Sequence, residues 1–354
     1  MALRVLVTGG AGFVGSHLAL GLRAGIEADV VALDNLHRCG SELNLPRVKQ
    51  GGVEFAHGDI RFEGDLDRSG PFDVLIECSA EPSVMAGYGE SPRYVIDTNL
   101  LGTVNCLEAA RKCGASVIFL STSRVYPLRL LNALRYHEGE TRFVLEEKQD
   151  VPGVSAKGIS EQFPLDGPRS LYGATKLASE LLLQEYVEMY GLRGVINRCG
   201  ILTGPWQMGK IDQGVVVLWA ARHVFGGPLS YIGYGGKGKQ VRDVLHVDDL
   251  LQLVLYQLDH LDEVSGEVFN VGGGLENAVS LRELTDLCRK YTGNRIEIQE
   301  EPETRPADVP IYITDNTKVS RATGWQPRKN PDSIMGELCE WIQSNREMLR
   351  LVLS

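Results

Sequence analysis

Three residues of the sequence could together move a proton on and off a hydroxyl group. Tyr172 and Lys176 are four positions apart, so in a helix they share one face. Thr122 lies in a Ser-Thr-Ser string directly after the apolar run 116–120 and could hold the reacting oxygen. A phenol has a pKa near 10, so a base working near pH 7 needs about three units of depression, or roughly 4 kcal/mol in favour of the phenolate. The Lys176 ammonium supplies positive charge of the required sign.

A Tyr-x-x-x-Lys pair alone occurs in many chains as a half-buried tyrosine beside a solvated lysine. Here a glycine-rich string precedes it: residues 8–15 read Thr-Gly-Gly-Ala-Gly-Phe-Val-Gly, after a short apolar run and before a helical pattern. Such a string permits a tight turn, lets a pyrophosphate approach the backbone, and packs the following helix closely on the strand. It predicts a dinucleotide site that contains Gly9, Gly12, Phe13, Val14 and Gly15.

The second apolar run ends in Asp34, 19 residues beyond Gly15. A carboxylate at about this distance binds the adenosine ribose of a dinucleotide and repels a 2′-phosphate, so NAD is favoured over NADP. Arg38 argues against this preference for NAD, because an arginine near the ribose accommodates the 2′-phosphate of NADP. Strand ends further along the chain should line the same crevice with Asp59, Ile60, Ser79 and Ala80. For each of these residues taken singly, an ordinary position in a turn is an equal alternative to cofactor contact.

The elements that must position these residues alternate between short apolar runs and longer runs of helical period. This order predicts an α/β fold, a Rossmann-type doubly wound parallel sheet. We expect strands at 4–7, 29–33, 73–76, 116–120 and 194–196, and helices that begin near residues 12, 98 and 172. Residues 1–200 are predicted to form the cofactor domain, with a long polar loop inserted at 127–167. Residues 201–354 should form a smaller α/β substrate region, either separate from the first domain or interleaved with it, with helices at 247–258, 280–291 and 333–345.

Composition narrows the classes of function. The 354 residues carry 36 Lys and Arg against 46 Asp and Glu, a formal charge of −10, which disfavours a nucleic-acid partner. No apolar run is long enough to span a bilayer, and no cleavable signal is expected at the N-terminus. Seven scattered cysteines without a C-x-x-C pair, and seven histidines without metal-binding spacing, predict reduced thiols, a cytoplasmic location and no metal site. His246 is expected to pack before a helix N-terminus rather than act as an acid or base.

Taken together, these motifs resemble the extended short-chain dehydrogenase/reductase family, which includes nucleotide-sugar epimerases and dehydratases. The likeness covers nearly the whole chain, and its further motifs are Asp34-Asn35-Leu36 with Arg38, Asn99 within 97–103, and residues 242–249. Within the family the chain looks most like the CDP-tyvelose (CDP-paratose) 2-epimerases. That closer likeness is carried by residues 121–126, 140–142, 212–214 and 238–243.

The resemblance implies a tightly held NAD that oxidises a sugar hydroxyl and returns the hydride to the other face of the ketone. It makes Tyr172 the base and Thr122 the residue that bonds the reacting hydroxyl, while Lys176 lowers the pKa of Tyr172 and binds the nicotinamide ribose. It also implies a homodimer built from the helices near 101–112 and 177–190. The cofactor set gains Asn35 and Asn99, and the substrate set is Thr122, Arg124, Gln213, Arg242 and Arg305, with Arg242 and Arg305 on the nucleotide diphosphate.

Alternatives remain open at this stage. A 4-epimerase uses the same Thr, Tyr and Lys and differs only in which sugar carbon faces the nicotinamide. Dehydratases of the family carry an acidic pair directly after the threonine, where this chain has Ser123 and Arg124, so elimination lacks its acid. A non-catalytic NAD-binding sensor would typically lose the Tyr or the Lys. Two departures from the family concern the sugar pocket: Ile201 replaces a common asparagine, and the stretch 127–135 is rich in Leu and Arg.

Overall fold

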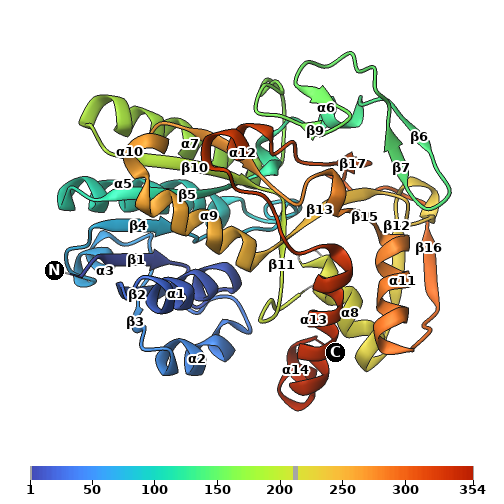
Figure 1. Cartoon of the computed structure of the whole chain (residues 1–354), viewed down its shortest axis with the longest axis horizontal. Coiled ribbons are helices and arrows are strands. Elements are labelled where there is room, and N and C mark those ends of the chain that lie inside the picture. The colour runs from blue at the N-terminus through green and yellow to red at the C-terminus, as the bar shows by residue number, and fades with distance from the viewer. Residues whose placement is uncertain (1, 210–213, 354) are drawn as a thin grey trace.

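The computed structural model of the chain describes residues 2–209 and 214–353. Its centre is a seven-stranded parallel sheet in the order β14-β10-β5-β4-β1-β2-β3 (Figure 1). The direction of strand addition reverses between β1 and β4, and this opens a crevice at the carboxyl ends of the strands. The predicted fold class is confirmed. The strands are β1 (Arg4–Thr8), β2 (Asp29–Asp34), β3 (Glu54–His57), β4 (Val74–Glu77), β5 (Ser116–Thr122), β10 (Gly194–Cys199) and β14 (Val268–Val271).

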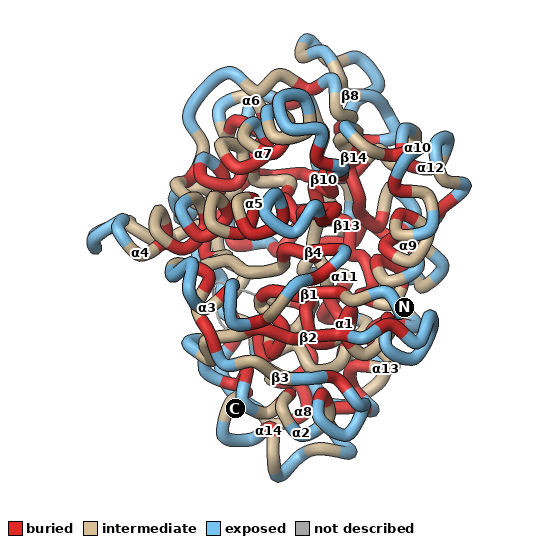
Figure 2. The backbone as a smooth tube through the Cα atoms, turned by 90° about the vertical axis from the view of Figure 1, so that its left-hand side faces the viewer, coloured by how far each residue is buried: buried red, intermediate tan, exposed pale blue. Residues whose placement is uncertain are grey.

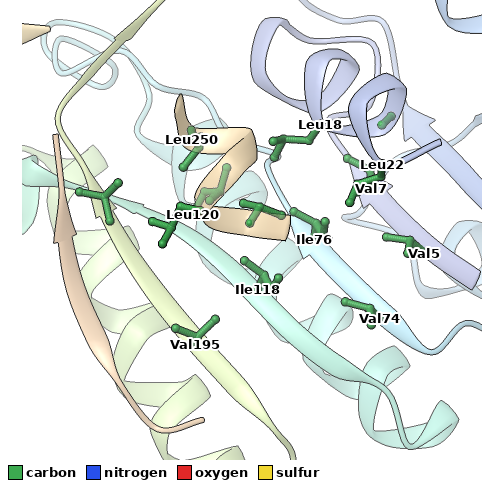
Figure 3. Packing of buried hydrophobic residues seen from close by; sticks show 14 of the residues in the cluster. Val5, Val7, Leu18, Leu22, Val74, Ile76, Ile118, Leu120, Val195 and Leu250 are labelled. Atoms are coloured by element: carbon green, nitrogen blue, oxygen red, sulfur yellow. The ribbon is translucent and has the colours of Figure 1, made fainter. Parts of the chain in front are cut away.

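Alternate residues of these strands face two layers of helices. One face packs against α1 (Phe13–Gly25) and α9 (Val247–Asp259), where Val7, Leu18 and Leu250 belong to one apolar cluster (Figure 3). Burial on both faces explains why the strands read as short, nearly continuous apolar runs. In Figure 2 the buried strands lie between helices whose outer sides are exposed.

The opposite face packs against α5 (Gly102–Cys113) and α7 (Leu171–Tyr190). Leu107 of α5 and Leu183 of α7 contact the sheet around Phe119. A cap at Ser170, whose side chain accepts from a backbone amide, starts α7 and fixes its first turn at the crevice. Shorter helices complete the layers, namely α2 (Leu45–Gln50), α3 (Glu63–Arg68), α4 (Arg93–Ile96), α10 (Leu261–Val264) and α12 (Thr317–Thr323).

Residues 127–167, expected to be a loop, contain ordered structure instead. Their apolar side chains, among them Leu131, Ile159 and Phe163, pack around Tyr126 and Tyr312 in a separate small core. The prediction of a loop was wrong because it weighed the polar residues and prolines and missed these short apolar stretches. The elements are α6 (Leu128–Asn132), the hairpin of β6 (Tyr136–Glu138) with β7 (Phe143–Leu145), and that of β8 (Val154–Ser155) with β9 (Gly158–Ile159).

The C-terminal half builds a second, smaller part beside the carboxyl edge of the large sheet (Figure 1). The three helices predicted there are present as α9, α11 and α13, and a capping box of Ser280 and Glu283 begins α11. β14 from this half is the edge strand of the large sheet, and α9 packs beside α1 on one face of that sheet. The chain therefore crosses between the two parts. The remaining elements are β11 (Ile201–Thr203), α8 (Val215–Phe225), β12 (Leu229–Ile232), β13 (Val241–His246), β15 (Ala278–Ser280), α11 (Leu281–Thr292), β16 (Ile298–Glu301), β17 (Ile311–Tyr312), α13 (Pro331–Ser344) and α14 (Arg346–Leu353).

Membrane-spanning segments are absent from the described helices, none of which combines the length and the apolarity that a bilayer crossing requires.

Candidate active site

A cavity of about 720 Å³ lies between the carboxyl ends of the large sheet and the C-terminal part. It adjoins a smaller cavity of about 250 Å³, since both are lined by Gly9, Gly12 and Arg38. The larger cavity also contains Phe13, Val14, Gly15, Thr122, Arg124, Tyr172, Lys176, Arg242 and Arg305, and the smaller one Asp34, Asn35, Asp59, Ile60, Ser79 and Ala80. The fold therefore gathers most of the predicted site residues into one continuous crevice.

The glycine turn after β1 has no room for side chains. Gly9 has φ +62°, and a Cβ on Gly15 would lie 2.1 Å from the Gly9 carbonyl oxygen. Gly12 precedes α1 without any side-chain cap, and the first turn of α1 carries no acidic residue. The free backbone N–H groups and the positive end of the helix dipole suit an anion such as a dinucleotide pyrophosphate. The residues present therefore fit the cofactor.

Asp34 ends β2 at the smaller cavity. Its carboxylate accepts hydrogen bonds from the amides of Ala11 at 3.0 Å and Leu36 at 2.7 Å, which fix it beside the glycine turn. Burial raises the pKa of Asp34 above its usual value, against the lowering effect of these amides. Arg38, the residue that could accommodate a 2′-phosphate, donates to the Met208 carbonyl at 2.9 Å. This bond draws the guanidinium toward the C-terminal part.

Asp59 is held at the same cavity by two neighbours. Asn35 Nδ2 donates to Asp59 Oδ2 at 2.9 Å, and the Arg61 guanidinium lies 2.6 Å from that oxygen. Although burial acts in the opposite direction, these donors lower the pKa of Asp59 to about 2, so it is ionised at neutral pH. Asn35 and Asp59 thus reach the cavity as a bonded pair.

Thr122 and Tyr172 meet because the start of α7 packs tightly on the end of β5. A Cβ on Gly173 would lie 2.0 Å from the Arg124 carbonyl oxygen, so glycine is needed for this close approach. Thr122, Tyr172 and Lys176 line the same cavity, and both the Thr122 hydroxyl and the charge of Lys176 act to lower the pKa of the Tyr172 phenol. Phenol, hydroxyl and ammonium therefore converge as the sequence spacing predicted.

Burial dominates the electrostatics of Tyr172. Desolvation raises the pKa of its phenol, while the charge of Lys176, the bond with Thr122 and the charge of Arg124 act in the lowering direction without overcoming it. A phenolate at this position needs further positive charge, and an oxidised nicotinamide ring supplies charge of that sign. The site is thus arranged so that proton loss from Tyr172 is easiest with an oxidised dinucleotide bound.

Two buried groups beneath the cavity were not predicted as site residues. Glu77, the last residue of β4, accepts a hydrogen bond from Lys176 Nζ at 3.1 Å. Glu180 bonds the hydroxyl of Ser121 and pairs with Arg198 at 2.7 Å, which anchors the strand end before Thr122. Sequence signals existed for both: Glu77 is a charge in an otherwise apolar strand, and Glu180 follows Tyr172 and Lys176 at helical spacing.

The substrate side of the large cavity is cationic. Arg242 Nη2 lies 2.7 Å from the Asp308 carboxylate, and Arg124 Nη1 donates to the Ala307 carbonyl at 3.1 Å. Burial lowers the pKa of Arg124 to about 10, which leaves it charged at neutral pH. Among the described lining residues the cations are Arg38, Arg124, Lys176, Arg222, Arg242 and Arg305, and the acids are Glu301 and Asp308. In a chain of net charge −10 this excess favours an anionic ligand.

Two predicted residues do not reach these cavities in the described structure. Asn99 is fully buried, and its side-chain amide bonds both backbone groups of Glu81 and the hydroxyl of Thr175. It holds the loop after β4 against α7 and lines neither cavity, because its amide is already used by protein partners. Gln213 lies outside the described residues.

His246 and its neighbours form a structural cluster outside the cavity. The buried His246 caps α9, since its Nδ1 accepts the amide of Asp248 at 3.1 Å. Asp248 and Glu337 approach the same histidine, and Lys329 Nζ bonds both carboxylates at 2.9 and 2.6 Å. The lysine ammonium compensates the two acids, which accounts for the cluster without a catalytic role.

A doubly wound sheet with a hydroxyl, a phenol and an ammonium gathered at its carboxyl edge defines the class of short-chain dehydrogenases/reductases. The chain belongs to the NAD dependent epimerase/dehydratase family, which residues 5–272 match. This confirms the resemblance drawn from the motifs and the prediction of NAD as the cofactor.

Named relatives carry out more than one reaction. CDP-paratose 2-epimerase of Salmonella typhi is 32% identical over 350 residues, 97% of this chain and 100% of the relative. The structure of Thermus thermophilus UDP-glucose 4-epimerase in complex with NAD is 29% identical, with a TM-score of 0.76 over 96% of this chain and 99% of that one. The dTDP-glucose 4,6-dehydratase DesIV of Streptomyces venezuelae, solved with NAD bound, is 29% identical with a TM-score of 0.78 over 98% of both chains. The family is therefore fixed, and its members include epimerases and dehydratases.

Proposed function

We propose that the protein is an isomerase that epimerises a nucleotide-linked hexose at C2 by transient oxidation and hydride return. The observation that carries the proposal is that Thr122, Tyr172 and Lys176 line one cavity in which Ser123 and Arg124, and no acid, follow Thr122. This set can remove and return a hydroxyl proton, but it offers no carboxyl group at the two positions after Thr122 to expel a water molecule. Re-reduction of the ketone is then the outcome of oxidation.

NAD, when bound, accepts and returns the hydride. We assign its pyrophosphate to the turn of Gly9, Gly12 and Gly15, where helix α1 presents free amides. Asp34 is assigned to the adenosine ribose, because its position at the end of β2 and its negative charge suit two hydroxyls and repel a 2′-phosphate. The remaining contacts are assigned to Phe13, Val14, Asn35, Arg38, Asp59, Ile60, Ser79, Ala80, Tyr172 and Lys176, while Asn99 is reassigned to holding the loop that contains Glu81.

Proton transfer is assigned to Tyr172. Its phenolate takes the proton of the sugar hydroxyl during oxidation, and the resulting phenol returns a proton to the same oxygen after the hydride reaches the other face of the carbon. Thr122 donates a hydrogen bond to that oxygen and so fixes it beside the phenol. Lys176 stabilises the phenolate from the next turn of the helix. Inversion further requires the sugar ring to present its second face between the two hydride transfers.

The nucleotide diphosphate is assigned to Arg242 and Arg305. Arginine forks match phosphate oxygens, and both side chains line the larger cavity. Arg124 lines the same cavity as Arg242 and Tyr172, so we assign it to the part of the substrate that joins the phosphates to the reacting carbon. Gln213 is retained as a substrate contact on the resemblance alone.

C2 is preferred over C4 because the sequence identity with CDP-paratose 2-epimerase, 32% over 97% of this chain, exceeds the 29% identity with the Thermus thermophilus 4-epimerase. A 4-epimerase is the second candidate, since the same three catalytic residues serve either carbon and a 4-epimerase shares the fold. Dehydration and a non-catalytic sensor rank below both. Dehydration lacks its acid after Thr122, and a sensor has no need of Thr122, Tyr172 and Lys176 together.

The experiment is incubation of the purified protein, without added cofactor, with CDP-, GDP-, UDP- and dTDP-hexoses in deuterated water, followed by proton NMR. Inversion at C2 without deuterium uptake supports the proposal and identifies the nucleotide. Inversion at C4 would replace it with the second candidate. No turnover, despite NAD recovered from the denatured protein, would contradict the assignment to these sugars and favour the sensor.

We further propose a cytoplasmic homodimer in which α5 and α7 of two copies pack together. Apolar side chains on these helices are exposed, including Leu181 at 55% and Met189 at 65%. All seven cysteines are free thiols, in keeping with a reducing compartment. Light scattering of Leu181→Glu should give a monomer where the parent chain gives a dimer, because two glutamates would be buried at the interface. A parent chain that is itself monomeric would contradict the dimer.

A further inference from the structure

Lys176 faces a buried carboxylate on the opposite wall of its pocket. Glu77 closes β4 with its side chain fully shielded from solvent, and Lys176 is only 3% exposed. The ammonium donates to Glu77 Oε2 at 3.1 Å and lies 4.3 Å from the centre of the Phe119 ring. Strands β4 and β5 and helix α7 thus enclose the lysine, and an acid from 99 residues earlier in the chain fixes its charged end.

Neither charge is stable here without the other. The second oxygen of Glu77, Oε1, has no hydrogen-bond partner among the residues that the structure describes. Burial of a carboxylate with only one hydrogen-bonded oxygen destabilises the fold unless a cation lies beside it. Removal of either member of such a pair leaves the other as an unpaired buried charge. The pair therefore behaves as a unit whose position is set by the last residue of β4.

The other titratable groups that face Lys176 cannot take over this role. They are Tyr172 on its own helix, Cys78 directly after β4, Cys106 on α5, and Cys199 at the end of β10. Burial raises the pKa of all three thiols, so none of them provides a negative charge at neutral pH. Burial by itself lowers the pKa of Lys176, but the charge and hydrogen bond of Glu77, together with the effects of Tyr172 and Cys78, raise it above the ordinary value.

We propose that Glu77 is a positioning residue of the reaction, which anchors the Lys176 ammonium opposite Tyr172 and keeps it cationic. This inference rests on the proposed function, in which the lysine charge stabilises the Tyr172 phenolate. Without Glu77 the lysine would sit in an apolar pocket and lose its proton at a lower pH. The phenolate would then lose the charge that supports it.

The first test compares pH profiles of kcat/KM for the parent chain and Glu77→Gln, which keeps the shape and an amide acceptor but removes the charge. The alkaline limb should move down by about one pH unit or more, because the lysine pKa falls. A matched control is Glu337→Gln, which removes a glutamate bonded to Lys329 at 2.6 Å outside the cavity. A purely structural pair would leave the profile of Glu77→Gln in place, and that result would overturn the proposal.

The second test needs neither turnover nor the single glutamine variant. Lys176→Met leaves the buried Glu77 carboxylate without its cation. The double variant, Lys176→Met with Glu77→Gln, should therefore melt at a higher temperature than Lys176→Met alone. Because both variants lack Lys176, any loss of bound NAD caused by its removal is the same in both. An equal or lower melting temperature for the double variant would refute the pairing even if no nucleotide sugar were turned over. A failure confined to the sugar panel would instead count against the proposed function.

Discussion

The two walls of the active-site crevice are built in different ways. The cofactor wall comes from strand ends and one glycine turn. Hydrogen bonds to nearby backbone amides and carbonyls hold Gly9, Gly12 and Asp34 in place. The substrate wall comes from side chains of distant segments, such as Arg124, Arg242 and Asp308, that meet only in the folded chain.

This difference separates what the fold requires from what the substrate requires. A glycine turn that cannot admit a Cβ can bind any dinucleotide pyrophosphate, whatever the sugar. Arg124 and Arg242 bond to residues 307–309, so we expect that they can change without disturbing the cofactor. The cofactor wall therefore carries the motifs that mark the family. Under the proposed function, the substrate wall would select the sugar.

Tyr172→Phe acts where the two walls meet and should have the largest effect. It removes the proton acceptor and leaves the ring, so turnover should fall by about a thousandfold or more while fold and bound NAD are retained. Initial rates, with NAD released from the denatured protein as the control, measure both. Activity close to that of the parent would show that Tyr172 is not the base.

Gly15→Ala should break the cofactor wall alone. The new Cβ would lie 2.1 Å from the Gly9 carbonyl oxygen, so the turn must open and the protein should lose most of its bound NAD. Gly25→Ala is the matched control on the same helix, where a Cβ would meet only Leu255 side-chain atoms at 3.8 Å. If both variants kept the same NAD content, the glycine turn would not be the pyrophosphate site.

Arg242→Gln should weaken the substrate wall alone, with the smallest effect of the three. Loss of charged hydrogen bonds to a phosphate should raise KM by about 10- to 100-fold, with bound NAD unchanged. Steady-state kinetics and NAD content test this together. A fall in NAD content equal to that of Gly15→Ala would contradict the separation of the walls.

The sequence predicts best where residues lie close to their own strand. The placement of the glycine turn, Asp34, Thr122 and the Tyr172/Lys176 pair in one crevice follows from local spacing, and five of the strands in the large sheet follow from apolar runs. β3 and β14 were missed because each has only four residues and polar residues interrupt or flank its apolar ones.

Sequence spacing carries little information where a side chain's partner lies far away in sequence. Asn99 was assigned to the cofactor, and the structure shows its amide bonded to Glu81 and Thr175, which the motif did not indicate. Glu77 was overlooked because its significance depends on Lys176, 99 residues later. The apolar side chains of 127–167 looked like parts of a loop because the tyrosines that they cover, Tyr126 and Tyr312, are separated by most of the C-terminal half.

The central claim is oxidation and internal hydride return at C2. It is tested most directly with CDP-paratose or CDP-tyvelose carrying deuterium at C2, incubated in ordinary water and analysed by NMR and mass spectrometry. The account predicts an inverted product that retains the deuterium, because the hydride stays on the bound cofactor between the two transfers. Loss of deuterium to solvent during inversion, or the absence of inversion at C2, would contradict it.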